Sequence, residues 1–229
     1  MISIVVPTYN EEKYIGETLD ALLALGDIEI IIAEDGSTDS TLEIIKSYSE
    51  RYEDITIASE KQRSGKGAAI KRGLNLAKGD LLGFIDADMA THPKELIKLK
   101  EEIDSGADIA IGSRNLKDSE IKIKQPPHRI FLGGVYRSLV RALLNVDVSD
   151  FQCGCKLFRR EVWESLDIVS DDFAFDTELL AKASARSYII KETPITWKNS
   201  EKSKVNPLTD TLKMFRTVLK VRGELNADK

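Results

Sequence analysis

Five short apolar stretches, each followed by residues at helical spacing, constrain the fold of this 229-residue chain more than any other feature. Each stretch has the length of a buried strand and ends in a short polar turn. The stretches are Ile2–Val6, Ile28–Ala33, Ile55–Ala58, Leu81–Ile85 and Asp108–Ile111. This alternation predicts an α/β domain with a mostly parallel central sheet and helices on both faces.

Polar residues follow the strands at the points where ligands bind in such sheets, outside the carboxyl ends. Tyr9–Glu11 and Asp35 follow the first two strands. Asp86 and Asp88 follow the fourth, and Arg114 follows the fifth. We therefore expect these side chains, from separate stretches of sequence, to converge on one rim.

The pair Asp86 and Asp88 stands at the end of an apolar run, one residue apart. Side chains alternate along an extended strand, so both carboxylates are expected on the same side. That geometry suits Mg²⁺ or Mn²⁺ with sites left open for phosphate oxygens, which would neutralise a leaving diphosphate. The alternative is a solvated strand-to-loop turn.

Other charged residues have both a functional and a structural interpretation. Asp35 could accept a hydrogen bond from a base N–H, or be an ordinary turn aspartate. Lys66 lies at a helix start, where backbone N–H groups attract anions, although its flanking glycines equally suit a structural cap. Arg114 and Arg129 have the planar forks that hold phosphate, and surface solvation is their alternative.

The second half of the chain is less regular. The segment Asn115–Arg129 is polar, contains two adjacent prolines and is predicted to be a mobile loop. Ile130–Leu144 is predicted as a helix, and Phe151–Phe158 and Tyr188–Trp197 as strands. Leu208–Val221 has the apolar stripe of an amphipathic helix.

Composition excludes several classes of protein. A formal net charge of −5 argues against nucleic acid as a partner. The N-terminus enters a strand without a signal peptide, and no apolar run approaches the roughly 20 residues of a transmembrane helix. We therefore expect a cytoplasmic protein, in which Cys153 and Cys155 are reduced, half-buried thiols.

The polar segments at the rim also carry a family resemblance. They are Val6–Glu11, Glu34–Ser37, Gly65–Gly67, Asp86–Asp88 and Gly112–Arg114. In this order and spacing they resemble the family 2 glycosyltransferases, which implies the GT-A fold, a Rossmann-like single domain. It further implies a nucleotide-sugar-binding half at 1–114, an acceptor-side half at 115–206 and a C-terminal amphipathic helix at 207–229.

Three later segments narrow the resemblance. Ser113–Ser119, Asp150–Phe158 and Phe173–Leu180 are similar to the polyprenyl-phosphate sugar synthases, and more to the dolichyl-phosphate glucosyltransferases than to the mannosyltransferases. This implies a metal-dependent enzyme that moves glucose from UDP-glucose to a polyprenyl or dolichyl phosphate with inversion. Because a lipid phosphate is already an anion, positioning and charge stabilisation are expected to carry most of the catalysis.

The resemblance assigns roles by position. The residues implied to line the nucleotide sugar are Pro7, Tyr9, Glu11, Asp35, Lys66, Asp86, Ala87 and Asp88. Of these, Asp86 and Asp88 would bind the metal. Arg114 and Arg129, joined by Lys204 from a loop, would bind the acceptor phosphate. The implied catalytic residues are Asp88, Arg114, Arg129 and Asp176, with Asp176 as the base if the acceptor is instead a hydroxyl.

Two departures from the family pattern keep alternatives open. Glu34 stands where an aspartate is usual, and Ala90 where the mannosyl branch often has a glutamine near the metal. The alternatives are GDP-mannose as donor, a soluble hydroxyl acceptor, or a nucleotide-sugar-binding module without activity. The oligomeric state, a homo-oligomer included, is left open.

A lipid acceptor also predicts contact with a membrane surface. Basic residues beside apolar stripes suit an interfacial helix. Ile130–Leu144, together with Leu208–Val221, has this pattern, and plain core packing of both helices is the alternative.

Overall fold

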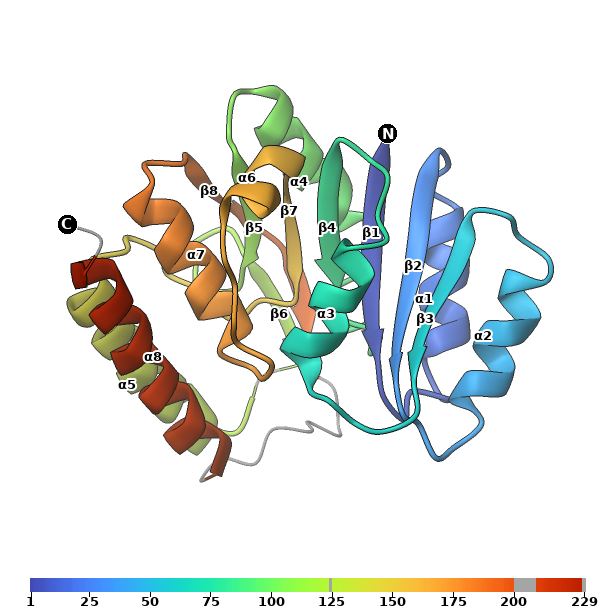
Figure 1. The fold of residues 1–229 in the computed structure, drawn as a ribbon, viewed down its shortest axis with the longest axis horizontal. Helices are drawn as coiled ribbons and strands as arrows, with labels where there is room; N and C mark the ends of the chain where they lie inside the picture. The colour runs from blue at the N-terminus through green and yellow to red at the C-terminus, as the bar shows by residue number, and fades with distance from the viewer. Residues whose placement is uncertain (124, 200–208, 228–229) are drawn as a thin grey trace.

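A seven-stranded sheet runs through the structure in the order β3-β2-β1-β4-β7-β5-β8 (Figure 1). The computed structural model describes residues 1–123, 125–199 and 209–227. The strands of the sheet are β1 Ile2–Thr8, β2 Ile28–Asp35, β3 Ile55–Glu60, β4 Leu81–Ile85, β5 Ile109–Ser113, β7 Cys155–Arg159 and β8 Ile190–Pro194. All five strands predicted in the first half are present.

Helices cover both faces of the sheet, as the sequence predicts. One buried apolar cluster joins the sheet to α1 (Ile15–Leu23), α2 (Thr41–Ser49) and α4 (Glu95–Asp104). The cluster on the other face joins it to five helices. They are α3 Lys66–Leu74, α5 Pro127–Leu144, α6 Arg160–Ser165, α7 Phe175–Ala185 and α8 Thr209–Ala227. Along β1, Ile4 and Val6 enter the first cluster and Val5 the second, as the alternation of a strand requires.

Strand β7 is the exception to the parallel arrangement. It pairs antiparallel with β4 and with β5, whereas the other pairs of this sheet are parallel. An antiparallel strand begins at the edge where its neighbours end, and Cys155 at the start of β7 pairs with Ile85 at the end of β4. The segment that leads into β7 therefore lies at the rim where β4 and β5 end.

The prediction that Pro7 ends the first strand is wrong, because β1 continues to Thr8. Pairing of β1 with β4 stops at Val5, while pairing with β2 continues and aligns Pro7 with Ala33. Beyond Val5 the strand has one partner, and an edge position tolerates a residue that has no N–H to donate.

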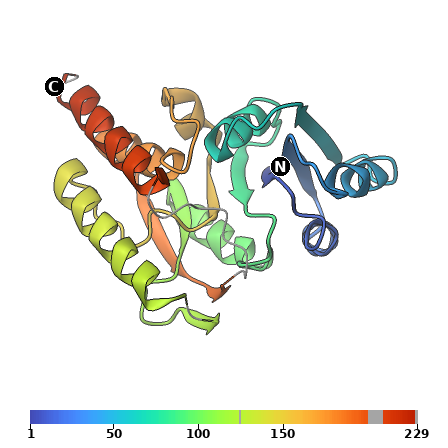
Figure 2. The same cartoon turned by 90° about the horizontal axis from the view of Figure 1, so that it is seen from below.

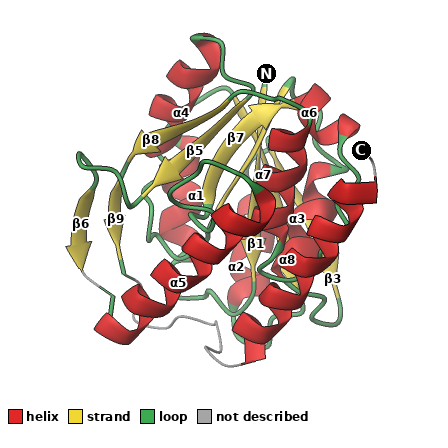
Figure 3. Ribbon diagram, turned by 90° about the vertical axis from the view of Figure 1, so that its left-hand side faces the viewer, coloured by secondary structure: helices red, strands yellow, loops and turns green. Residues whose placement is uncertain are grey.

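The second half departs further from the predictions. The predicted loop Asn115–Arg129 contains β6 (Glu120–Ile123) and the first turn of α5, which starts with Pro127 as helix starts often do. The predicted strand Tyr188–Trp197 is two strands, β8 and β9 (Thr196–Lys198). β9 pairs with β6 in a separate two-stranded ladder, which Figure 3 shows apart from the main sheet.

Other boundaries shift for identifiable reasons. The predicted strand Phe151–Phe158 shortens to β7, because the buried ammonium of Lys156 binds the carbonyl oxygens of Phe151 and Cys153 and draws that segment out of line. The short helix α6 was not predicted. α8 is described over Thr209–Ala227 and so continues beyond the predicted end at Val221, while the predicted start at Leu208 lies outside the described residues.

Helices α5 and α8 lie side by side at one end of the molecule (Figures 1 and 2). Tyr136, Val140 and Leu144 of α5 are buried against the core. The first half of α5 also exposes four large apolar side chains, here called the α5 patch: Ile130, Phe131, Leu132 and Val135. Within the described residues, none of the helices combines the length and apolarity needed to cross a membrane.

Candidate active site

The predicted rim exists as a row of charged side chains between β4 and β5. Asp86 follows β4, and its backbone N–H donates to the carbonyl oxygen of Gly154, 2.9 Å away. Arg114 follows β5, and its backbone N–H donates to Asp150 Oδ2 at 2.9 Å. The segment Asp150–Gly154 therefore touches both strand ends.

Lys66 forms an ion pair with one of the two predicted metal-binding carboxylates. It is the first residue of α3, and its Nζ lies 2.8 Å from Asp86 Oδ1 and 3.8 Å from Asp176 Oδ2. Burial alone would lower the pKa of Lys66, but the charges of Asp86 and Asp176 outweigh burial and hold it above its usual value. Lys66 is therefore an ammonium group at the rim at any physiological pH.

Asp35 contacts the turn that starts α3. Its carboxylate is buried and accepts the backbone N–H groups of Ser64 and Gly65, at 3.0 and 2.9 Å, and the Ser64 hydroxyl. These hydrogen bonds fix the turn from which Lys66 extends. The assignment of Asp35 to the nucleotide stays a prediction.

Gly154 leaves the space that Asp86 occupies. A Cβ at this position would lie 1.8 Å from Asp86 Oδ2 and 2.1 Å from its Cγ, far inside contact distance. The absence of a side chain is thus a condition for the observed position of Asp86, and it explains the glycine between Cys153 and Cys155.

The carboxylates of Asp86 and Asp88 fit a divalent cation that takes most of its ligands from elsewhere. Asp86 is 34% exposed, with one oxygen on Lys66, and Asp88 Oδ1 accepts the N–H of Ala90 at 3.0 Å. Among the described residues, no group of three or more His, Cys, Asp or Glu side chains is placed to hold a metal. Two carboxylates suit Mg²⁺ or Mn²⁺ only if diphosphate oxygens and water complete the shell.

A buried ion pair continues the row of charges into the core. The side chain of Lys156 is 0% exposed, and its Nζ donates to Asp176 Oδ1 at 2.5 Å. It also donates to the carbonyl oxygens of Phe151 and Cys153, at 3.0 and 2.7 Å. Asp176, 2% exposed, therefore lies between two ammonium groups, Lys66 and Lys156.

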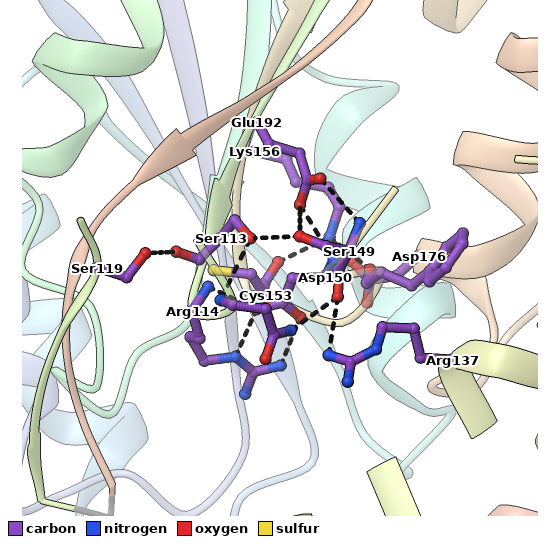
Figure 4. Close-up of polar contacts among 12 residues, drawn as sticks. Ser113, Arg114, Ser119, Arg137, Ser149, Asp150, Cys153, Lys156, Asp176 and Glu192 are labelled. Carbon is purple, nitrogen blue, oxygen red and sulfur yellow. Dashed lines mark hydrogen bonds and ion pairs between the residues drawn. The ribbon is translucent and has the colours of Figure 1, made fainter. Parts of the chain in front are cut away.

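Arg114 and Asp150 form the second centre of the site (Figure 4). Arg114 Nε and Nη2 donate to the two oxygens of Asp150, each at 2.7 Å, a bidentate pair. Burial would raise the pKa of Asp150, but the Arg114 charge holds it below its usual value of 3.8. The guanidinium also lies over the Trp197 ring, 5.3 Å from its centroid.

Glu192 of β8 fixes the segment that carries Asp150. Its carboxylate accepts the backbone N–H groups of Ser149 and Asp150, at 2.8 and 3.1 Å, and the Ser149 hydroxyl at 2.7 Å. The Ser149 hydroxyl also lies 3.1 Å from that of Ser113, at the end of β5. Asp150, and with it Arg114, is therefore held from two strands of the sheet.

A cavity of about 340 Å³ opens beside Arg114. Its wall combines Arg114, Asp150 and Gln152 at the rim with Arg137 and Gly133 of α5. Ile121 of β6 and Trp197 of β9 contribute apolar surface. The cavity wall thus combines charged and apolar side chains, and the separate β6–β9 ladder contributes part of the apolar surface.

The other residues assigned from sequence have mixed outcomes. Pro7 lies in β1, and beyond it the Arg63 guanidinium stacks 4.3 Å from the Tyr9 ring centroid. The backbone N–H of Glu11 donates to the Thr41 hydroxyl at 2.8 Å. Ala87 is buried, and its carbonyl oxygen accepts the Thr18 hydroxyl.

Two of the cations assigned from sequence have side chains outside the described residues. Arg129 belongs to α5, but its side chain lies outside the described residues, as does the whole of Lys204. The cysteines are more buried than predicted, with Cys153 1% and Cys155 0% exposed. Burial raises the pKa of Cys153 to about 12, so its thiol is unreactive.

Sequence reasoning gave Asp150, Lys156 and Glu192 no role, and placed Arg137 only among the basic residues of a helix that contacts the membrane surface. A lysine inside an apolar strand is a usable signal, because a buried ammonium needs a carboxylate partner. The roles of the other three residues are evident only from contacts between segments that are distant in the sequence.

Comparisons with known proteins agree with this geometry. A family model described as Glycosyl transferase family 2 matches residues 3–166. Glycosyltransferase AglD of Haloferax volcanii is 34% identical over 98% of this chain. Dolichyl-phosphate beta-glucosyltransferases are 33% identical over 96% of the chain in Dictyostelium discoideum and 30% identical over 96% in Homo sapiens.

The lengths of these relatives differ from that of the chain. The chain spans 37% of AglD, 73% of the Dictyostelium protein and 74% of the human one. Among solved structures, glucosyl-3-phosphoglycerate synthase from Mycobacterium tuberculosis, in complex with Mn²⁺, UDP and glucosyl-3-phosphoglycerate, is similar with a TM-score of 0.80. The match covers 97% of this chain and 80% of that structure at 23% identity, and it confirms the predicted GT-A fold.

Proposed function

The chain belongs to glycosyl transferase family 2, and from this membership we propose that it transfers glucose from UDP-glucose to a polyprenyl phosphate. The observation that carries the proposal is the segment Asp150–Gly154, which joins the backbone of Arg114 to that of Asp86. A group that binds an anionic acceptor is thereby connected to one that faces a nucleoside diphosphate. The names of the relatives support glucose and dolichyl phosphate as substrates.

The donor would lie along the carboxyl ends of β1, β2 and β4. Tyr9 and Glu11 stand where the nucleoside enters, and Lys66 at the start of α3 contacts the diphosphate. Asp86 and Asp88 would hold Mg²⁺ or Mn²⁺, which supplies charge stabilisation for the departing UDP. Asp35 fixes the turn from which Lys66 extends.

The acceptor phosphate would bind at Arg114, whose orientation Asp150 fixes. A phosphate oxygen attacks the anomeric carbon of glucose as the bond from that carbon to the UDP oxygen breaks. The electron pair of the broken bond leaves with UDP. A single displacement of this kind inverts the anomeric configuration and gives a β-linked glucosyl phosphate lipid.

No general base is required for this reaction, because the attacking oxygen is already anionic. Asp176, the base assigned if the acceptor is a hydroxyl, is 2% exposed and held by Lys156 at 2.5 Å. In the proposed function it positions Lys66 instead. The assignment of Arg129 and Lys204 to the acceptor phosphate stays a prediction, as does the division of the chain near residue 114.

We also propose that the protein contacts a membrane surface through the α5 patch. Phe131 is 70% exposed and Val135 52% exposed, and both lie on the helix that borders the cavity beside Arg114. Such a surface would bring the acceptor site to a lipid whose phosphate lies in the headgroup layer.

Transfer of radiolabel into the organic phase tests the function. The purified protein is given UDP-glucose or GDP-mannose, a polyprenyl phosphate and Mn²⁺ or Mg²⁺, with Asp88→Ala as the control. Label from UDP-glucose that is lost in the variant is the expected result. Label only from GDP-mannose would show that GDP-mannose is the donor. No label, together with tight nucleotide binding, would favour a different acceptor or a binding module.

A further inference from the structure

We propose that the first half of α5 builds the acceptor subsite, in which Arg137 supplies a second guanidinium for the phosphate and Gly133 leaves room for the apolar chain. The inference rests on the proposed function and extends it to residues outside the family motifs. It names the acceptor class as an acyclic polyprenyl monophosphate, whose head and tail meet different walls of one cavity.

Arg137 is placed to share an anion with Arg114. It is half-buried, and its Nη1 donates to the carbonyl oxygen of Ser149 at 3.2 Å. Figure 4 shows Arg114 and Arg137 approaching the Ser149–Asp150 segment from opposite sides, one from β5 and the other from α5. The guanidinium groups of Arg114 and Arg137 thus both line the cavity.

The charged side chains that line the cavity carry one net positive charge within the described part of the chain. They are Arg114, Arg137 and Asp150. Asp150 is engaged by the bidentate pair with Arg114, so the charge of Arg137 is the surplus. A phosphate monoester carries between one and two negative charges near pH 7, and planar forks are suited to its oxygens.

Gly133 is unusual for a residue in the middle of a helix. Glycine there costs about 1 kcal/mol relative to alanine, so its presence calls for a reason other than helix stability. A Cβ at Gly133 would meet no atom within 4 Å, and the residue lines the cavity. The missing side chain therefore widens the cavity rather than relieving a clash.

Part of the cavity wall is apolar and reaches the α5 patch at Ile130. Ile121, Trp197 and Ile130 line the cavity beside the polar Asn115 and Gln125, and Ile130 is 55% exposed at the start of α5. Charged and apolar side chains in one cavity complement an amphiphile with a phosphate head. An acceptor without a tail would leave this apolar wall uncovered.

Direct binding, without any sugar donor, tests the subsite. Farnesyl monophosphate is titrated by calorimetry, and methyl phosphate, a head without a tail, by ³¹P NMR. The variants are Gly133→Leu and Arg137→Met. Their matched controls are Gly223→Leu, an exposed glycine of α8 that also has open space around it, and Arg141→Met, one turn further along α5 and paired with Asp147.

We expect Gly133→Leu to weaken the binding of farnesyl monophosphate at least about tenfold and to leave the binding of methyl phosphate unchanged. Arg137→Met should weaken both ligands at least about tenfold, the effect of a lost charged hydrogen bond, and Arg137→Lys should recover part of it. Both controls should bind as the wild type does, and each variant should be as thermally stable as its matched control.

Other results would overturn the inference. They are a wild type that does not bind farnesyl monophosphate, a Gly133→Leu variant that binds it as well as Gly223→Leu does, or an Arg137→Met variant indistinguishable from Arg141→Met. The proposed function fails separately: if the expected binding pattern is found but no donor gives glucose transfer, the subsite stands and the reaction does not.

Discussion

At the scale of single residues, Asp150 and Gly154 limit the distance between the acceptor site at Arg114 and the metal-binding carboxylate of Asp86. Asp150 orients Arg114, and Gly154 makes room for Asp86. Four peptide steps separate them, so their Cα atoms can lie at most about 14 Å apart. One short segment therefore holds both centres within the reach of a sugar and two phosphates.

Gly154→Ala should lower glucose transfer with little effect on the free energy of unfolding. The added methyl would overlap Asp86 Oδ2, 1.8 Å away, and the carboxylate would have to rotate off Lys66. Because a side-chain end moves cheaply, the free energy of unfolding should change by no more than about 1 kcal/mol, while glucose transfer falls about 100-fold.

Urea denaturation and the transfer assay measure the two effects. Gly16→Ala is the control, because its added methyl would meet only the Tyr48 hydroxyl at 3.6 Å, an ordinary contact. Full activity in Gly154→Ala would contradict the role given to Asp86.

Asp150→Asn should lower stability in a pH-dependent way. The pKa of Asp150 is held below 3.8 by Arg114 against the effect of burial. A carboxylate with a lowered pKa stabilises the fold fully above pH 3.8, and the contribution is lost as the pH falls through the folded-state pKa. At pH 7 the variant should lose stability at the lower end of about 3–5 kcal/mol, since Arg114 is 24% exposed.

The gap between wild type and Asp150→Asn should therefore shrink below pH 3.8. Urea denaturation at a series of pH values measures it. A gap of constant size from pH 7 to pH 3 would show that the charge of Asp150 is not its source.

Sequence predicted residues at strand ends well and residues that act through distant contacts poorly. Asp86 and Arg114 each follow an apolar strand, and the rule that parallel strands present ligands at their carboxyl ends places them together. Asp150 and Glu192 have no such local signal, because their roles come from pairing across 36 and 42 residues of chain. Lys156 alone was open to inference, as a charge inside an apolar strand.

At the scale of elements, α5 contacts the core and the cavity and also exposes a third side. Its Tyr136 side packs on the core, its Gly133 side borders the cavity, and the α5 patch faces outward. The sequence predicted this helix and its apolar character, but not which apolar residues are buried. That division depends on α8, which lies beside α5 and has its own apolar residues Val218 and Val221 buried.

The double variant Phe131→Ser with Val135→Ser should weaken membrane association. Burying a large apolar side chain contributes roughly 1.5–3 kcal/mol, so loss of two should reduce binding to anionic liposomes more than about 100-fold. Flotation measures it, with Leu76→Ser, 48% exposed away from α5, as the control. A wild type that does not float with the liposomes would contradict the membrane proposal.

The elements of the first half were predicted more accurately than those of the second. In the first half, regular alternation of strand and helix fixes where each element must lie. In the second half, β7 runs antiparallel and β9 leaves the main sheet for β6. Strands this short, five and three residues, gain their pairing from tertiary context rather than from pattern.

At the scale of the whole molecule, a row of alternating charges links the rim to the core. It runs from Asp86 through Lys66 and Asp176 to Lys156, and thus connects β4, α3, α7 and β7. The ring of Phe84 lies near both ammonium groups, 5.9 Å from Lys66 and 5.4 Å from Lys156. The position of Asp86 therefore depends on how helices and strands pack around a buried ion pair.

Lys156→Met should be strongly destabilising. It would leave Asp176 buried without its 2.5 Å partner and two carbonyl oxygens without a donor. The expected loss is about 3–5 kcal/mol, as measured by urea denaturation. Removing the carboxylate as well, in Lys156→Met with Asp176→Leu, should recover part of it. Exposed ion pairs contribute only about 0–1 kcal/mol. A Lys156→Met variant whose loss of stability lies in that range would therefore show that the buried pair does not stabilise the fold.

The central claim is that a lipid phosphate oxygen displaces UDP from glucose in one step. NMR of the purified product tests this most directly, because the anomeric coupling and the carbon–phosphorus coupling report both configuration and attachment. The account predicts glucose in β configuration, bonded through C1 to the phosphate of the polyprenyl chain. An α-linked product, or glucose attached to anything other than that phosphate, would contradict it.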